Sequence, residues 1–303
     1  MSWTEPNDPE CKTQEALELV IEAKERKITD HFSVRRLIPI AKKRSIGPFI
    51  FFDHMGPVDL LPENDSDVLP HPHIGLATVT YLFEGEIFHR DRIGSAIPIR
   101  PGDINWMTAG RGIVHSERTT PEESGKRRRL HGLQLWVALP AEQEETDPAF
   151  EHQDAAALPA TEIGGVKLRI LAGSAYGQKS PVRILSPLFY VDAHLPANTE
   201  LEITEEYAER SAYIVSGSVS YNGVIYKPGT MLVFQPAAKS RIKATEETRV
   251  MLLGGPPLDG PRHMYWNFVS TSRDRIEKAK RDWAERRFPA IPDDDIEFVP
   301  LPA

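Results

Sequence analysis

The sequence predicts an all-β protein built from sandwiches or barrels, and two observations lead to this fold class. Short runs rich in β-branched and aromatic residues recur along the chain between Gly-Pro, Pro-Gly and Glu-Gly turns; they include Phe49–Phe52, Ala77–Phe83, Leu133–Val137 and Val166–Ile170. Proline fills 26 of the 303 positions, whereas its usual share is roughly 5%. Because proline interrupts helices and central strands, this composition favours many short strands joined by turns.

The same order of strands and turns occurs twice in the chain. Tyr81–Glu86, an aromatic strand that runs into a glycine turn, is followed by the turn at Pro101 and Gly102. In the second half, residues 213–223 are followed by the same kind of turn at residues 228–229. This repeat indicates a duplicated β unit. Residues 141–163 are acidic, rich in alanine and proline and weakly patterned, so we expect them to connect the two units.

A short helix is predicted near each end of the chain. Thr13–Arg26 has the apolar spacing of an amphipathic helix, at Ala16, Leu17, Val20 and Ala23. Near the other end, Ser270–Ser272 can cap a helix over Arg273–Arg287, which Pro289 and Pro292 would end. The apolar tail Ile296–Leu301 either lies back across the body of the protein or contacts a second subunit.

Charge and composition exclude several classes of protein. The net charge is −8, and the run Lys126–Arg129 is too short to supply the basic surface that duplex nucleic acid requires, so we expect a solvated loop there and no direct nucleic-acid binding. Cys11 is the only cysteine, so no intrachain disulfide can form. The sequence lacks both an apolar run long enough to cross a membrane and a signal-peptide pattern. We therefore expect a soluble, cytoplasmic protein that does not contact membranes.

Four potential metal ligands occur in two pairs. His71 and His73 form the first pair, and His115 and Glu117 form the second. Side chains at positions i and i+2 of a strand point to the same face, so each pair can reach one ion. Three neutral imidazoles and one carboxylate suit a divalent iron, manganese, nickel, copper or zinc ion, and they leave coordination positions open. The spacing favours a metal site over the alternative, a hydrogen-bonded polar cluster.

The longer motifs around these residues resemble the pirin family of the cupin superfamily. The resemblance rests on HPHIGLATVTYLFEGEIFHRD, RPGDINWMTAGRGIVHSE and HGLQLWVALP, with residues 49–57 upstream and GVKLRILAG and YIVSGSV in the second half. It covers roughly residues 30–255.

This resemblance implies a bicupin, with two tandem jelly-roll barrels. Residues 30–140 would form an N-terminal metal-binding barrel and residues 165–255 a metal-free barrel, while residues 256–303 would form a helix and tail that pack on the body. It also implies that one divalent transition metal is held by His71, His73, His115 and Glu117. Fe(II) is the metal that the resemblance favours, and Ni, Cu, Mn or Zn also suit such a site.

The resemblance leaves two classes of function side by side. The first is a quercetin 2,3-dioxygenase-like enzyme that opens a flavonol or a similar aromatic enol, with Glu117 as the catalytic group that takes the substrate proton. The alternative is a metal-dependent regulatory protein that binds a protein partner without turnover. A third option is a cupin with a different small-molecule reaction.

Some positions depart from the family pattern or stay open. Many pirins have a basic and an acidic residue at the positions of Ile74 and Ala77, so we expect a more apolar cavity here. The second barrel has only the isolated His194 and His263, which predicts no metal site there. His54 either lines the cavity mouth or has a structural role. His131 either supports a metal ligand from the second shell or has a structural role. Trp106 and Met107 are expected to pack the barrel wall, and Asp103 to stabilise a turn.

Overall fold

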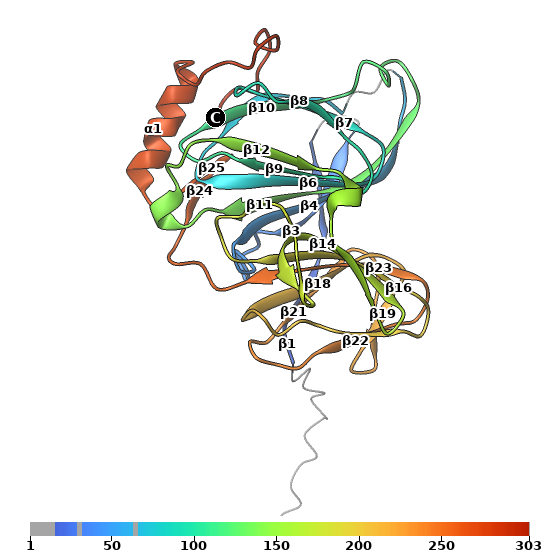
Figure 1. Cartoon of the computed structure of the whole chain (residues 1–303). Helices are drawn as coiled ribbons and strands as arrows, with labels where there is room; N and C mark the ends of the chain where they lie inside the picture. The colour runs from blue at the N-terminus through green and yellow to red at the C-terminus, as the bar shows by residue number, and fades with distance from the viewer. Residues whose placement is uncertain (1–15, 29–31, 63–65, 303) are drawn as a thin grey trace, which may run out of the picture.

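The computed structural model describes residues 16–28, 32–62 and 66–302. Two β barrels lie one above the other in Figure 1, with the N-terminal barrel in the upper part. The α-helix of the described residues lies against the side of this upper barrel, although it belongs to the C-terminal end of the chain. The all-β, two-barrel architecture predicted from the sequence is therefore confirmed.

The N-terminal barrel consists of two sheets. The larger sheet has seven strands in the order β12-β9-β6-β11-β4-β3-β2, and the smaller has four in the order β5-β10-β7-β8. Their bounds are β2 Lys24–Lys27, β3 Ser33–Ile38, β4 Phe49–Leu60, β5 Val68–His73, β6 Leu76–Glu84, β7 Ile87–Asp91, β8 Ala96–Ile99, β9 Ile104–Thr108, β10 Ile113–Arg118, β11 Arg128–Ala138 and β12 Ala149–Gln153.

The C-terminal barrel repeats this plan. Its larger sheet follows the order β1-β21-β18-β23-β16-β14-β13, with β15 paired to β14, and its smaller sheet follows β17-β22-β19-β20. Their bounds are β1 Leu17–Glu22, β13 Ala160–Ile163, β14 Val166–Ala175, β15 Gln178–Lys179, β16 Phe189–Leu195, β17 Glu200–Glu202, β18 Glu209–Ser216, β19 Val219–Tyr221, β20 Val224–Tyr226, β21 Thr230–Phe234, β22 Arg241–Ala244 and β23 Thr248–Gly255.

The predicted N-terminal helix over Thr13–Arg26 is wrong for the residues that the structure describes. They form strand β1, which pairs with β21 of the second barrel, and strand β2, which pairs with β3 of the first. Strand β1 is apolar on both faces, because Val20 packs on the core of the second barrel while Ile21 packs in the layer between the barrels. A bulge near Leu17 adds to this pattern, so the spacing of apolar residues mimics a helix. Residues 13–15 and Cys11 lie outside the described residues.

The predicted connection at residues 141–163 contains more structure than its sequence suggests. Strand β12 pairs with β9 of the first barrel, and β13 pairs with β14 of the second. Two short 3-10 helices, Ala141–Gln143 and Ala155–Ala157, lie beside them. Because β12 and β13 are edge strands with few buried side chains, they lack a marked hydrophobic pattern.

The C-terminal segment returns from the second barrel to the first. Strands β24 (His263–Tyr265) and β25 (Phe268–Ser270) form a hairpin, and helix α1 follows at Arg273–Ala284. Ser272 caps the helix by accepting a hydrogen bond from the backbone N–H of Arg275, as predicted. The buried helix face is formed by Ile276, Ala279 and Trp283.

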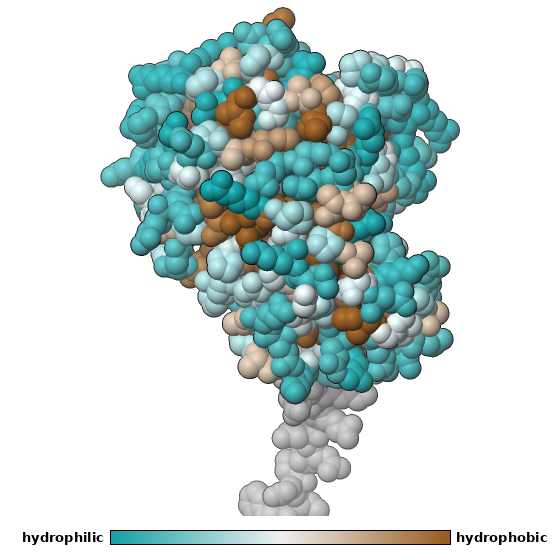
Figure 2. All heavy atoms as spheres, in the orientation of Figure 1, coloured by the Kyte–Doolittle hydropathy of each residue, from teal (hydrophilic) through white to brown (hydrophobic). Residues whose placement is uncertain are grey.

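An apolar layer joins the two barrels. Val79 and Leu133 of the first barrel share a buried cluster with Leu171 and Met251 of the second. Hydrogen bonds cross the same layer, including one of 2.7 Å from the Tyr81 hydroxyl to an Asp192 carboxylate oxygen. The exposed face of the molecule in Figure 2 is mostly hydrophilic, with apolar residues gathered in separate patches. No helix within the described ranges is long and apolar enough to cross a membrane.

Candidate metal centre

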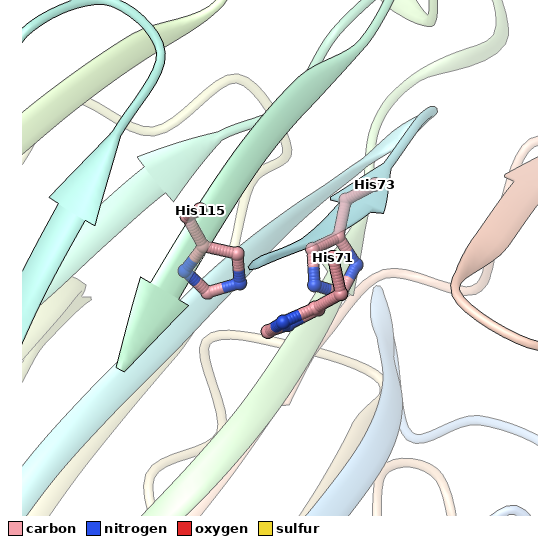
Figure 3. Close-up of side chains that lie close together, drawn as sticks. All are labelled: His71, His73 and His115. Carbon is pink, nitrogen blue, oxygen red and sulfur yellow. The ribbon is translucent and has the colours of Figure 1, made fainter. Parts of the chain in front are cut away.

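Three histidines meet on two neighbouring strands of the first barrel. His71 and His73 lie on β5 and His115 on β10, and the antiparallel register places His115 opposite His71. Figure 3 shows the three rings converging from these strands. Alternation along β5 explains why the first pair shares one face, since Pro72 between them points the other way. The structure therefore brings together the three histidines that the spacing predicts.

The cluster is compact and buried. Each ring offers a nitrogen that lies within 4.8 Å of the others. The ring centroids are 4.3 Å apart for His71 and His115, and 5.0 Å apart for the two pairs that include His73. The residues are 7%, 1% and 1% exposed for His71, His73 and His115. One ion of transition-metal size can therefore contact all three rings after small side-chain movements.

Several nitrogens of this cluster lack a hydrogen-bond partner among the described residues. They are Nδ1 of His73 and both ring nitrogens of His115. His71 differs, because its Nδ1 lies 2.8 Å from the Leu69 carbonyl oxygen and donates a hydrogen bond to it. The lone pair of the neutral ring is then on Nε2, where it can bind a metal. Unpartnered buried polar atoms are rare and costly. A cation that binds these lone pairs would satisfy them, so the donor set fits a metal ion.

The protonation of the three rings also suits metal binding. Burial lowers the pKa of His71 to about 4, and its hydrogen bond to Leu69 opposes this shift only in part. Burial, together with the neighbouring imidazoles, holds the pKa of His73 and of His115 well below the ordinary value. All three rings are consequently neutral near pH 7, which is the form that binds metals.

Glu117 occupies a different position from the one its spacing suggests. It follows His115 by two residues on β10, but the pairing with β5 has a bulge between them. Among the described residues, the cluster of mutually close ligand atoms contains the three histidines without Glu117. One Glu117 oxygen accepts a hydrogen bond of 3.2 Å from the Thr80 hydroxyl, which also donates to Gln134. Burial raises the pKa of Glu117, although His89 and Thr80 oppose the shift. Its role as fourth ligand stays a prediction.

His89 is a neighbour of the site that the sequence analysis did not single out. It lies on β7 opposite Glu117, and its ring centroid is 5.3 Å from that of His115. Its Nε2 lies 3.1 Å from an Asp91 carboxylate oxygen, and its ring stacks on Phe150 at 4.3 Å. The alternation of His89 and Asp91 along a strand, beside a predicted metal site, is the signal that could have revealed it.

A cavity of about 410 Å³ reaches the cluster from outside. His71, His73 and Glu117 are among the residues that line it. Phe51 and Trp136, stacked with ring centroids 4.1 Å apart, form an aromatic wall. At the same wall Arg36 donates two hydrogen bonds of 2.8 Å to Asp53, and its guanidinium lies 4.3 Å from the Phe51 ring centroid. The C-terminal segment contributes Met264, Trp266, Asn267 and Val299.

The structure also places the residues that the sequence left open. His54 lies between the barrels, where its Nδ1 is 2.5 Å from the Tyr213 hydroxyl oxygen and its Nε2 is 2.7 Å from Nε2 of His131. Neither histidine lines the cavity. Their hydrogen bonds to each other and to Tyr213 fit a structural role. Ile74 packs under helix α1 and Ala77 in the layer between the barrels. Neither residue lines the cavity, so the expected link between these two residues and the polarity of the cavity is not supported.

A second group of potential ligands lies at the edge of the same barrel. Asp103, His152 and Asp154 have ligand atoms within 4.8 Å of one another. Asp103 accepts hydrogen bonds from the backbone N–H groups of Arg100 and Ala155, at 3.2 and 2.9 Å, so it stabilises a turn as predicted. His152 bonds to Asn105 at 2.7 Å and to Asp154 at 3.3 Å. Internal hydrogen bonds account for this group, in contrast to the unpartnered cluster.

Comparison with known proteins identifies the family of the chain. Residues 31–137 match the Pirin family, and residues 190–289 match the Pirin C-terminal cupin domain. A pirin-like protein of Caulobacter vibrioides is 50% identical over 292 residues, which cover 94% of this chain and 99% of that protein. The chain belongs to the pirin family. A tomato (Solanum lycopersicum) pirin-like protein is 34% identical over 82% of this chain and 84% of its own length.

A solved structure supports the same assignment of this pirin. The crystal structure of quercetin 2,3-dioxygenase from Acinetobacter baumannii matches with a TM-score of 0.86 and 34% sequence identity. The match covers 94% of this chain and 95% of that one. The resemblance to the pirin family and the bicupin fold are thus confirmed.

Proposed function

We propose that this pirin is a metal-dependent dioxygenase that acts on a flavonol or a similar aromatic enol. His71, His73, His115 and Glu117 would hold one divalent transition metal, with Fe(II) as the first choice. The observation that carries the proposal is the set of three buried imidazoles beside a cavity. His73 and His115 have ring nitrogens without a hydrogen-bond partner among the described residues. The likeness to a quercetin 2,3-dioxygenase supports the choice of substrate.

The cavity suits a flat aromatic molecule. Its volume of about 410 Å³ lies within the range of small-molecule sites. The stacked rings of Phe51 and Trp136 offer an apolar wall against which a substrate ring can pack. Arg36 lies over Phe51 and is fixed by Asp53, so the wall keeps its orientation. These side chains would exclude water and orient the substrate towards the three histidines.

Glu117 is proposed to take up the proton of the substrate hydroxyl. A bound divalent metal supplies a Lewis acid, which lowers the pKa of a hydroxyl group in contact with it. Glu117 can accept that proton on a carboxylate oxygen, and its burial favours the protonated form. Thr80 would hold one carboxylate oxygen in place through its hydrogen bond of 3.2 Å. The three imidazoles stay neutral throughout, since burial keeps them from competing for the proton.

The test combines metal analysis with oxygen uptake. Purified protein reconstituted with Fe(II) should bind one metal per chain and consume oxygen when quercetin is added. His73→Ala should lose both properties, whereas His194→Ala in the second barrel should keep both, because His194 is exposed and outside the cluster. Absence of metal after reconstitution with Fe, Ni, Cu, Mn and Zn would contradict the metal centre. Stable metal binding without oxygen uptake would contradict the dioxygenase and favour a metal-dependent regulatory protein.

A further inference from the structure

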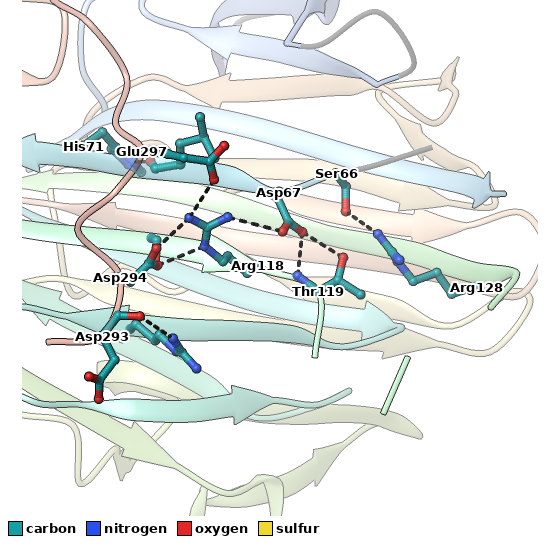
Figure 4. A network of polar contacts seen from close by, with 12 residues as sticks. Ser66, Asp67, His71, Arg118, Thr119, Arg128, Asp293, Asp294 and Glu297 are labelled. Atoms are coloured by element: carbon teal, nitrogen blue, oxygen red, sulfur yellow. Dashed lines mark hydrogen bonds and ion pairs between the residues drawn. The ribbon is translucent and has the colours of Figure 1, made fainter. Parts of the chain in front are cut away.

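Strand β10 presents two chemically different faces. His115 belongs to the histidine cluster and Glu117 lines the cavity, whereas Ser116 and Arg118 donate hydrogen bonds to Asp294 of the C-terminal tail. Figure 4 shows the contacts of Arg118 with Asp294. Ser116 is fully buried, and the Arg118 side chain is 21% exposed. The residues on the outer face therefore alternate with the predicted ligands along the same strand.

Arg118 makes a two-pronged contact with the tail beyond helix α1. Its Nε and one terminal nitrogen donate to the two oxygens of Asp294, at 2.9 and 2.6 Å. The Ser116 hydroxyl donates to the same carboxylate at 2.6 Å. The Asp294 side chain is 7% exposed, so water screens this pair poorly. Glu297 adds a weaker contact of 3.5 Å from an exposed position.

The same arginine also reaches the beginning of β5. Its other terminal nitrogen lies 3.7 Å from one Asp67 oxygen, next to the strand that carries His71 and His73. The second Asp67 oxygen accepts two hydrogen bonds from Thr119, at 2.6 Å from the backbone and 2.8 Å from the hydroxyl. The end of β10 is thereby tied to the start of β5 by side chains.

This connection spans the irregular part of the strand pairing. The register between β5 and β10 shifts between His115 and Glu117, so the backbone ladder is interrupted there. A slip of one residue in a strand turns its side chains to the opposite face. Contacts outside the ladder, from Arg118 and Asp67, oppose such a slip.

The tail also covers the free edge of β5. Strand β5 is the outer strand of its sheet, and the backbone N–H of Val299 donates to the Pro70 carbonyl oxygen at 2.9 Å. Trp283 of helix α1 donates a hydrogen bond of 3.0 Å from its Nε1 to the Val299 carbonyl oxygen. Val299 further lines the cavity that contains the histidines.

We propose that Arg118 is a positioning residue for the metal centre, acting with Asp294 of the tail and with Asp67. It holds β5 and β10 in the register that directs His71, His73 and His115 to one point. The C-terminal tail is therefore part of the metal-binding apparatus of the first barrel, although none of its residues is a predicted ligand. This inference rests on the proposed metal centre.

The experiment measures cobalt(II) affinity in the full-length protein by visible absorption and chelator competition. Arg118→Ala should weaken cobalt(II) binding by about 10- to 100-fold, the range for residues that orient ligands, and alter the cobalt(II) absorption bands. Asp294→Asn, which keeps the shape of the side chain, should act in the same direction with a smaller effect. It serves as the second variant if Arg118→Ala does not fold.

The matched control is Arg262→Ala. Arg262 and Glu144 form a buried ion pair of 3.0 Å that ties the same C-terminal segment to the first barrel, and neither residue lies on β5 or β10. This variant should lower the thermal midpoint of the metal-free protein and leave cobalt(II) affinity unchanged. Equal affinity in wild type, Arg118→Ala and Asp294→Asn would overturn the inference alone, and so would equal weakening by Arg262→Ala. A wild-type protein that binds no metal would overturn the proposed function and this inference together.

Discussion

The two barrels share one architecture but differ in what fills them. In the first barrel, His71, His73, His89 and His115 are buried, and His71, His73 and Glu117 line a cavity. The interior of the second barrel is a continuous apolar cluster that includes Val166, Leu168, Phe189, Ile214, Leu232, Val250 and Leu252. The described histidines with less than a tenth of their surface exposed all belong to the first barrel, whereas His194 on β16 of the second is half-exposed.

This difference shows how a duplicated fold can separate stability from chemistry. Side chains of valine, leucine and isoleucine stabilise the second barrel by about 1.5 to 3 kcal/mol each when fully buried. In the first barrel, the ring nitrogens of His73 and His115 that lack partners among the described residues are destabilising, since each unsatisfied group costs about 1 to 3 kcal/mol. Strand β1, near the N-terminus, pairs with the second barrel, and the C-terminal tail packs on the first. These two segments therefore link the two barrels.

The largest expected effect concerns metal affinity. His115→Ala should weaken metal binding by at least about 100-fold, because loss of a ligand exceeds the effect of losing a group that only orients one. Isothermal titration with nickel(II) measures this affinity. His194→Ala is the control from the second barrel and should bind like the wild type. Equal nickel(II) affinity of His115→Ala and His194→Ala would contradict the prediction that the first barrel holds the metal and the second does not.

A second prediction concerns the pH dependence of stability in metal-free protein. His71 stays neutral in the folded state down to a pKa of about 4, whereas its ordinary value is 6.5. As pH falls below 6.5, the unfolded state takes up a proton that the folded state does not, so the free energy of unfolding decreases. For His71 alone the loss reaches about 2 kcal/mol near pH 5.

Urea denaturation at several pH values between about 7 and 5 measures this loss. His71→Leu should make the profile less steep, because it removes one of the three cluster histidines whose pKa is lowered in the folded state. Leu252→Ala in the second barrel should lower the free energy of unfolding at every pH and leave the profile as steep as in the wild type, because it removes no titratable group. A His71→Leu profile as steep as that of wild type would show that other groups cause the pH dependence.

The smallest expected effect is a gain in stability. His115→Leu in metal-free protein should raise the free energy of unfolding by about 1 kcal/mol, because both ring nitrogens of His115 lack partners in the described part of the chain. The opposite is expected in the second barrel, where Leu252→Ala should cost about 2 to 5 kcal/mol. Denaturant titration compares both variants with the wild type. Destabilisation by His115→Leu would mean that the cluster is satisfied without a metal.

Much of the fold and of the site could be read from local patterns. Alternation along a strand correctly predicted that His71 and His73 share a face, and the serine cap with apolar spacing predicted helix α1. Turn residues between short strands, together with the repeat, predicted two β units. The family motifs then predicted the bicupin fold, and the comparisons confirmed it.

Other features depended on partners that lie far away in the sequence. The segment at β1 has a pattern that fits a helix or a strand buried on both faces, and only its pairing with β21 decided between them. The approach of His89 to His115, the burial of Ile74 under α1 and the position of Val299 on the edge of β5 are likewise long-range contacts. Periodicity reports which face of an element is apolar, but it does not report what covers that face. The sequence by itself therefore determined the two β units and the inward direction of the histidines. The tertiary structure alone decided what surrounds them, because packing joins residues whose separation along the chain leaves no local pattern.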